Sequence, residues 1–173
     1  MKKSINHIRY IIVLVLIGLS TSGYSQTHPT DSIPPDPGAL SVYNVQNLSF
    51  GAFSHGSAGG SVSVSANGDR SVLGTVTPLN LGFAYYQAIF EIEAPEGSII
   101  SIMNGPDAML TGSNGGSMKL TIGTSSRGSM FLNSVPSPNR VPIHIGGTLT
   151  VGNISNNPPG KYTGTFFITF NQE

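Results

Sequence analysis

Close to its C-terminus the chain reads Gly160-Lys161-Tyr162-Thr163-Gly164-Thr165-Phe166-Phe167-Ile168-Thr169-Phe170. Successive side chains of a β-strand point to opposite faces, so Phe166, Ile168 and Phe170 share one face and threonines occupy most of the other. Pro158 and Pro159 indicate a turn just before this stretch. It therefore predicts a last strand with an aromatic face in the core. Burial of each large side chain contributes about 1.5–3 kcal/mol, so loss of this strand is expected to unfold the domain.

Shorter stretches with the same alternation precede this strand. Ser61–Ala66 alternates without a break, which predicts that Val62 and Val64 face inward. Asn67-Gly68 follows and favours a hairpin, because both residues tolerate positive φ, with a return strand over 71–77. Further strands are expected over 40–50, 87–94, 98–103, 118–122, 141–145 and 148–151, with loops over 51–60 and 104–116 and a bend at Gly146-Gly147. Pro142 cannot donate a ladder hydrogen bond, so its segment is expected to be an edge strand or a strand entrance.

Turns rich in Gly, Pro, Asn and Ser separate these strands every ten to fifteen residues, and outside the first twenty-five residues nothing has an apolar stripe of helical period. This pattern is typical of an all-β sandwich or barrel. A length of 173 residues suits one domain. The absence of cysteine excludes disulfides and thiolate metal sites. We therefore expect a single antiparallel Ig-like β-sandwich over residues 39–173.

The first residues have the features of a targeting peptide. Met1–Arg9 is basic, Ile11–Leu19 is apolar, and small residues at positions 23 and 25 precede a cut before Gln26. Residues 1–25 are therefore predicted to be a cleaved signal peptide. Residues 26–38 contain four prolines and are predicted to form a Pro-rich linker. The exported chain is expected in the periplasm, at the cell surface or outside the cell, with no membrane span after cleavage.

The charge that remains after the predicted cut is mildly acidic. Five basic residues stand against eight acidic ones, a balance of about −3 (five minus eight). A nucleic-acid partner would have no electrostatic basis on such a chain, because phosphate binding requires an excess of Lys and Arg.

Several short strings resemble, in their order, a bacterial family catalogued as domain of unknown function 4402. These strings are Leu48-Ser49-Phe50-Gly51, Gly59-Gly60-Ser61-Val62-Ser63-Val64-Ser65, Gly68-Asp69-Arg70, Met118-Lys119-Leu120, Ile145-Gly146-Gly147-Thr148-Leu149-Thr150-Val151 and Gly160-Lys161-Tyr162-Thr163-Gly164-Thr165-Phe166. The resemblance extends roughly from Ala39 to Asn171, with Leu73-Gly74-Thr75 where the family usually has a glycine pair. The resemblance implies an exported Ig-like β-protein, whose closing strand is similar to that of spore-coat-U-like and chaperone-usher pilin domains. It implies no activity.

The histidines are the first candidates for chemistry. His55 and His144 can meet in space, and Asp69 or Asp107 can complete a site with them. Their places in a Gly-rich loop and on a strand favour ordinary exposed histidines, and His28 lies in the predicted linker. No two ligand types stand at metal-binding spacing, and no Asp/Asn-rich calcium loop is present.

Carboxylates and serines point to no reaction either. Glu91 and Glu93 lie two apart on one predicted strand face, near Glu96; paired carboxylates can perform acid–base chemistry, but this setting favours a solvated sheet face. No serine stands in a Gly-x-Ser-x-Gly elbow. The sequence therefore predicts no catalytic residue, no cofactor and no metal.

Tyr85 and Tyr86 are the candidate contacts for a ligand or partner. Adjacent residues at a strand entrance face opposite sides, so one tyrosine can lie in the core while the other is exposed. An exposed tyrosine can stack on a sugar ring or anchor a protein contact. Half-burial at a sheet edge, without any binding role, is the favoured interpretation.

These observations favour an exported, non-enzymatic structural or adhesive protein of the bacterial cell envelope or surface, as a subunit of a filament or other assembly that uses edge strands. The four prolines of residues 26–38 do not suit an alternating donor strand, so a self-complete domain is expected. The alternative is a small extracellular glycan- or ligand-binding module that uses the loops near 51–60, 104–116 and 124–139. A hydrolase is the least favoured class.

Overall fold

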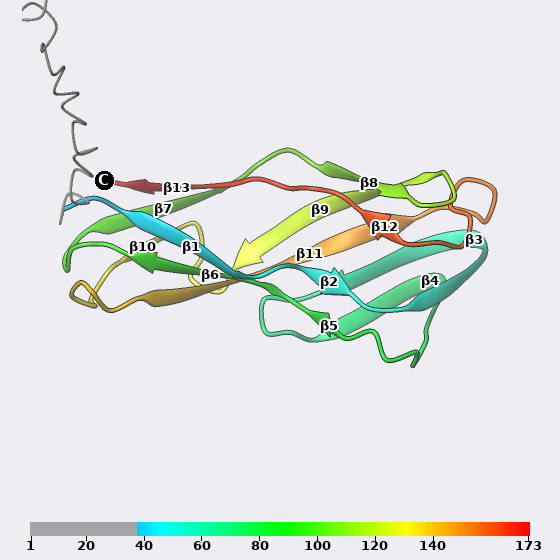
Figure 1. Ribbon diagram of the computed structural model, residues 1–173, viewed down its shortest axis with the longest axis horizontal. Helices are drawn as coiled ribbons and strands as arrows, with labels where there is room; N and C mark the ends of the chain where they lie inside the picture. Colours follow the sequence, from blue (N-terminus) through cyan, green and yellow to red (C-terminus); the bar gives the residue numbers. More distant parts are fainter. Residues whose placement is uncertain (1–37) are drawn as a thin grey trace, which may run out of the picture. The chain divides into compact units, whose positions relative to one another are not determined.

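The computed structural model describes residues 38–173, which form β-strands joined by turns and loops (Figure 1). The predicted signal peptide and the linker up to residue 37 lie outside the described residues. The strands are β1 (Ser41–Gln46), β2 (Ser49–Phe50), β3 (Phe53–Val64), β4 (Arg70–Pro78), β5 (Tyr85–Tyr86), β6 (Ala88–Glu93), β7 (Ile99–Asn104), β8 (Ala108–Gly112), β9 (Ser117–Ser125), β10 (Met130–Leu132), β11 (Val141–Val151), β12 (Tyr162–Thr163) and β13 (Ile168–Gln172). The predicted all-β class is confirmed.

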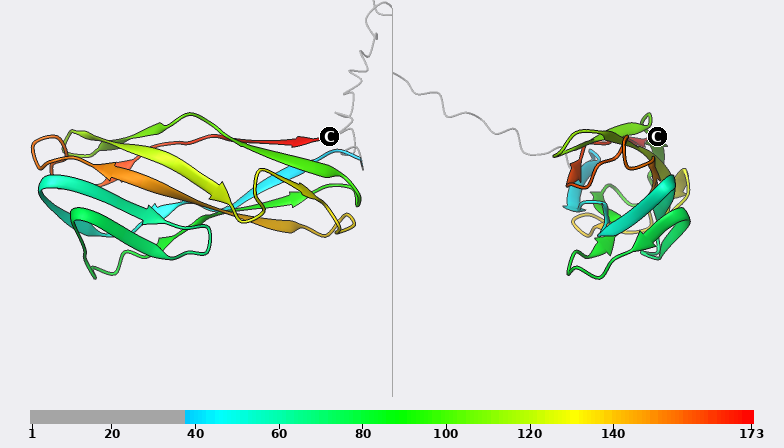
Figure 2. Two further views of the ribbon diagram at one scale, coloured as in Figure 1. Left: turned by 180° about the vertical axis from the view of Figure 1, so that it is seen from behind. Right: turned by 90° about the vertical axis from the view of Figure 1, so that its right-hand side faces the viewer.

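The longest sheet is built around β11. Its eight strands follow the order β1-β6-β11-β9-β8-β12, with β3 paired to β11 and β4 paired to β3. The first half of β11, Val141–Ile145, pairs with β6, and the second half, Gly147–Val151, pairs with β3. A three-stranded sheet has the order β10-β7-β13, and β2 and β5 form a two-stranded sheet (Figure 2). Each of these strand pairs is antiparallel.

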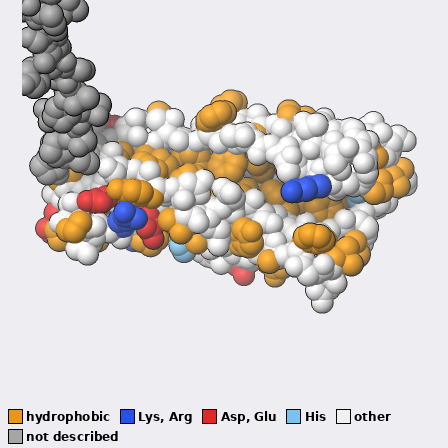
Figure 3. All heavy atoms as spheres, in the orientation of Figure 1, with side chains coloured by type: hydrophobic (Ala, Val, Ile, Leu, Met, Phe, Trp, Pro, Cys, Tyr) orange, Lys and Arg blue, Asp and Glu red, His pale blue; other side chains and the backbone are white. Residues whose placement is uncertain are grey.

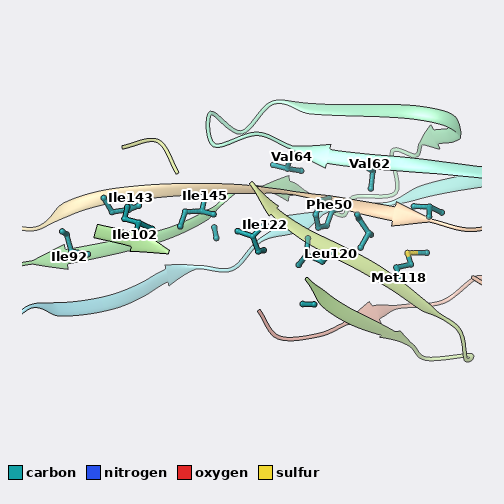
Figure 4. Packing of buried hydrophobic residues seen from close by; sticks show 14 of the residues in the cluster. Phe50, Val62, Val64, Ile92, Ile102, Met118, Leu120, Ile122, Ile143 and Ile145 are labelled. Atoms are coloured by element: carbon teal, nitrogen blue, oxygen red, sulfur yellow. The ribbon is translucent and has the colours of Figure 1, made fainter. Parts of the chain in front are cut away.

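One hydrophobic cluster draws on both larger sheets (Figure 4). Val62, Ile143 and Ile145 contribute fully buried side chains from the eight-stranded sheet, and Ile100 contributes one from β7. The period-two alternation predicted that Val62 and Val64 face inward, and the structure confirms this. The two sheets are therefore held together by one shared core.

The predicted hairpin at Asn67-Gly68 is confirmed. Val64 pairs with Arg70, Gly68 has a φ of 87°, and the Ser65 amide donates to the Asp69 carbonyl. The loop predicted over residues 51–60 is wrong, because β3 already begins at Phe53 and pairs with β4 there. Its register shifts between His55 and Gly60, which marks a bulge. Glycines therefore mark a distorted strand here, and not its end.

Two other glycine-rich segments also differ from the prediction. Residues 104–116 contain β8, because pairing with β9 extends the backbone that composition alone assigned to a loop. Gly146-Gly147 does not separate two strands: β11 continues through it, with a shift in its register to β9 between Ile145 and Gly147. A Cβ on Gly146 would lie 2.1 Å from the Val64 carbonyl oxygen, so glycine is needed for close passage beside β3. Pro142 stands at the entrance of β11, one of the two predicted places, although β11 as a whole is central in its sheet.

The predicted last strand is divided in two. β12 pairs with β8 of the large sheet and β13 pairs with β7 of the smaller one, with residues 164–167 between them. A Cβ on Gly164 would lie 2.7 Å from the Met109 carbonyl oxygen, so the chain passes very close to β8 there. The inward face was predicted correctly, because Phe166, Ile168 and Phe170 pack against the core, but they are only half-buried.

Candidate functional site

An apolar groove separates the first strands of the domain from the last ones. One rim is formed by residues between Asn44 and Phe53, and the other by residues 158–168. The groove has a volume of about 980 Å³. In the space-filling view it appears as a hydrophobic hollow between two largely polar bands (Figure 3). We call these two bands the N-terminal rim and the C-terminal rim.

The floor of the groove is the hydrophobic core itself. Met118 and Leu120 of β9 and Leu149 of β11 line it, and all three belong to the buried cluster. Phe90 and Leu110 line it as partly buried neighbours. No carboxylate lines the groove, and Lys161 is the only Lys or Arg among its lining residues. An occupant would therefore meet an apolar and nearly uncharged surface.

Both rims contain backbone groups that no other strand uses. Within the described residues, no backbone hydrogen bond involves Gly164, Thr165 or Phe166, which separate β12 from β13. The same holds for Asn47 and Leu48, which separate β1 from β2. Backbone N–H and C=O groups next to an apolar surface need a partner or water. Two edges with free hydrogen-bonding capacity thus face each other across the floor.

Beyond the ends of the two rims, side-chain contacts close one end of the groove. The rings of Phe90 and Phe170 lie with their centroids 5.6 Å apart. The Gln172 Nε2 atom donates to the Gly38 carbonyl oxygen over 3.1 Å. The C-terminal rim is thereby joined to the start of the domain, and the groove opens beyond this closed end.

A buried asparagine fixes the other end of the C-terminal rim. Asn157 is 1% exposed, its Nδ2 donates to the Ser117 carbonyl over 2.6 Å, and its Oδ1 accepts from the Gly152 amide. The His55 Nε2 lies 2.9 Å from the Asn157 carbonyl oxygen. The Tyr162 hydroxyl donates to the Pro158 carbonyl over 2.7 Å. Sequence reasoning missed Asn157, because asparagine beside Pro158 indicates only a turn.

The predicted contact residues Tyr85 and Tyr86 form β5, next to the groove. Both are partly exposed, at 46% and 38%, so neither lies in the core, and the favoured interpretation of half-burial at a sheet edge agrees with the structure. The reason is that β5 is two residues long and pairs only with β2, outside the larger sheets. Whether either tyrosine contacts a ligand stays a prediction.

Arg70 lies against Tyr85 and gives this corner a positive charge. Its guanidinium is 5.3 Å from the ring centroid of Tyr85, and its Nη2 donates to the Ala52 carbonyl over 2.7 Å. Burial lowers the pKa of Arg70, although arginine stays charged at any physiological pH. Arg70 and Tyr85 line a smaller hollow of about 530 Å³ with residues 78–84.

The structure places the other chemical candidates in separate surroundings. His55 contacts the Asn157 backbone, and the strand segment of His144 pairs with β6. Asp107 forms an ion pair of 3.0 Å with Lys119, and this bond, together with one to Thr121, lowers the pKa of the Asp107 carboxyl. Across residues 38–173, no group of three His, Asp or Glu side chains is placed to hold a metal ion.

Glu91 and Glu93, the predicted solvated pair, bind an arginine. Arg140 lies 3.4 Å from a Glu91 oxygen and 3.9 Å from a Glu93 oxygen. Its guanidinium also sits 3.6 Å from the ring centroid of Tyr43. The four side chains form a surface cluster across β1, β6 and the start of β11, which is a structural arrangement typical of an exposed sheet face.

Comparison with known proteins gives one match. Residues 40–171 match the family described as Domain of unknown function (DUF4402), which agrees with the resemblance of the short strings. Neither a curated protein nor a solved structure matches the chain. The similarity of the closing strand to spore-coat-U-like and pilin domains stays a prediction. The part of the chain from residue 38 onward has no helix long and apolar enough to cross a membrane.

Proposed function

Because the chain belongs to the DUF4402 family, whose description states no function, we propose a function from the groove. The protein is an exported, non-enzymatic structural or adhesive subunit of the bacterial cell envelope or surface. It joins a filament or another assembly through the open edge between its first and last strands. The export half of this proposal is supported by the predicted signal peptide.

The observation that carries the proposal is the apolar floor between two unpaired edges. Unpaired strand edges are templates for pairing with another chain, and proteins usually cover or blunt them. Large exposed apolar hollows on monomers mark interaction sites in the same way. A surface with both properties suits a protein whose final state is a complex.

The test uses the full chain with an epitope tag in the bacterium that produces it. Cell fractionation followed by native gel electrophoresis is expected to find the protein in the envelope or at the surface, in complexes far larger than its 18.1 kDa chain. A matched variant without residues 2–25 is expected to stay in the cytoplasm as a monomer. A full-length protein that is cytoplasmic and monomeric would contradict the proposal.

The aromatic corner at Tyr85 supports a second candidate, a small extracellular glycan- or ligand-binding module. An exposed tyrosine beside a partly desolvated arginine can stack on a sugar ring and bind its polar groups. Binding on a glycan array that is lost in Tyr85→Ala or Tyr86→Ala, and retained in Tyr43→Ala on β1, would favour this candidate. An array with no binding would favour the assembly role.

A further inference from the structure

We propose that the groove accepts a β-strand from another protein. The strand is extended, free of proline and apolar at alternate positions. This inference rests on the proposed assembly role and specifies the partner's chemistry. It assigns the binding to the N-terminal and C-terminal rims and not to other edges of the sheets, such as β4.

Hydrogen bonding identifies the occupant as a strand. The two rims run in opposite directions along the groove, as the paths of β1–β2 and β12–β13 show (Figure 1). A strand laid between them can pair with both, parallel to one rim and antiparallel to the other. A helix satisfies its backbone internally, and an acyl chain has no hydrogen-bonding groups. Either of these would leave Gly164, Phe166 and Leu48 unpaired.

The floor determines the side chains that such a strand needs. Alternate residues of a strand point to one face, so every second side chain would meet Met118, Leu120 and Leu149. These positions must be apolar, because an unpaired charge on this surface would lose its water without gaining a partner. Gly160 to Ile168 span nine residues of the C-terminal rim. A strand of matching length covers roughly 30 Å at about 3.3 Å per residue.

The segment that precedes the domain in this chain does not fit the requirement. Pro29, Pro34, Pro35 and Pro37 lack the amide donors that a strand with neighbours on both sides must supply. The domain also starts at the closed end, where Gly38 accepts from Gln172. The strands inside residues 38–173 already belong to sheets. We therefore assign the occupant to a different polypeptide.

The experiment screens the purified full-length protein, or its naturally processed form, against two nonapeptide libraries. In the first, Thr or Ser is held at odd positions and apolar residues vary at even positions. The second is identical except for a central proline. The first library is expected to yield binders by fluorescence anisotropy, and the second at least about tenfold fewer. Bound peptide is expected to slow hydrogen exchange at Leu48, Gly164 and Phe166 at least about tenfold.

Two lysine variants locate the binding. Leu48→Lys puts a charge in the groove and is expected to weaken peptide binding at least tenfold, whereas Leu73→Lys, at a 73% exposed position on β4, is expected to leave it unchanged. Thermal melts establish that both variants fold. If Leu48→Lys does not fold, the hydrogen-exchange pattern of the unmodified protein with bound peptide shows whether the peptide lies between the rims.

The following results would overturn the inference: no binder in the first library, equal binding by the proline library, or protection of β4 in place of the rims. The protein alone could instead form oligomers that an excess of a rim-binding peptide dissociates. In that case the occupant of the groove is a strand of a second copy of this chain and not of a different protein. Envelope complexes that persist in the Leu48→Lys variant would refute strand binding in the groove, while the proposed assembly role would stand. A cytoplasmic monomer that still binds strands in vitro would refute the assembly role alone.

Discussion

At the scale of single residues, Asn133 and Asn157 organise the loops beside the strands. Asn133 is 2% exposed; its Nδ2 donates to the carbonyls of Ala94, Pro95 and Val135, and its Oδ1 accepts from the Val135 amide. One side chain thus donates to three loop carbonyls, of which, within residues 38–173, only that of Pro95 also accepts from a backbone amide, the one of Ser98. Neither asparagine could be recognised in the sequence, because the carbonyls they bond come from segments up to 40 residues away.

Asn133→Ala is expected to destabilise the protein by about 1–3 kcal/mol, because it leaves buried carbonyl groups without donors. Urea denaturation measures the change in the free energy of unfolding. Asn80→Ala, at an exposed position, is the matched control and is expected to change it by less than about 0.5 kcal/mol. Equal effects of the two substitutions would contradict the role given to Asn133.

Phe167 and Phe170, near the C-terminus, differ in exposure in the way that alternation predicts. Phe170 packs on Phe90, whereas Phe167 is 69% exposed. Phe170→Ala is expected to cost about 2 kcal/mol, less than a fully buried phenylalanine, because the ring is only half-buried. Phe167→Ala is expected to have little effect. Thermal unfolding of the two variants side by side tests this, and a larger loss for Phe167→Ala would reverse the assigned faces.

At the scale of elements, the β3–β4 hairpin shows why glycine content misled the prediction. Composition treats a run of Gly and Ser as a loop, whereas β4 pairs with the same residues on both sides of the bulge. Gly60 has a φ of 155°, and a Cβ there would lie 2.0 Å from the Leu73 carbonyl oxygen. The glycine is thus required by a neighbouring strand, which cannot be identified from the local sequence.

Gly60→Ala is therefore expected to destabilise the hairpin strongly, by more than the roughly 1–3 kcal/mol that an unfavourable φ alone costs. Gly82→Ala is the control, because Gly82 also has a positive φ, of 79°, but a Cβ there would meet open space. Chemical denaturation of both variants separates the clash from the backbone strain. Similar losses of unfolding free energy in the two variants would show that β3 and β4 can move apart at the bulge.

At the scale of the whole molecule, one core serves both sheets and the groove. Residues such as Leu120 and Leu149 are buried within the cluster and also line the groove floor. The molecule therefore combines an ordered interior with an apolar opening in its surface. Dyes that fluoresce on apolar surfaces usually report loosely packed states.

This protein is expected to bind such a dye, anilinonaphthalene sulfonate, while it is fully folded. Fluorescence titration below the melting temperature measures the binding. Leu48→Lys is expected to reduce the dye fluorescence several-fold, and Leu73→Lys is expected to leave it unchanged. The reason is that Leu48 lines the groove and Leu73 does not. A folded protein without dye fluorescence would show that the groove closes in solution.

The sequence by itself determined the all-β class, the family, the Asn-Gly hairpin and the inward positions of Val62, Val64 and the closing aromatic stretch, since these depend on local turn chemistry and on period-two alternation. Tertiary structure alone decided that β11 continues through two glycines, that the last strand divides between two sheets, and that a groove lies beside it. The physical reason is that strand pairing joins residues far apart in the chain: which edges find a partner, and which stay open, depends on the closing of the whole molecule and not on any one stretch of it.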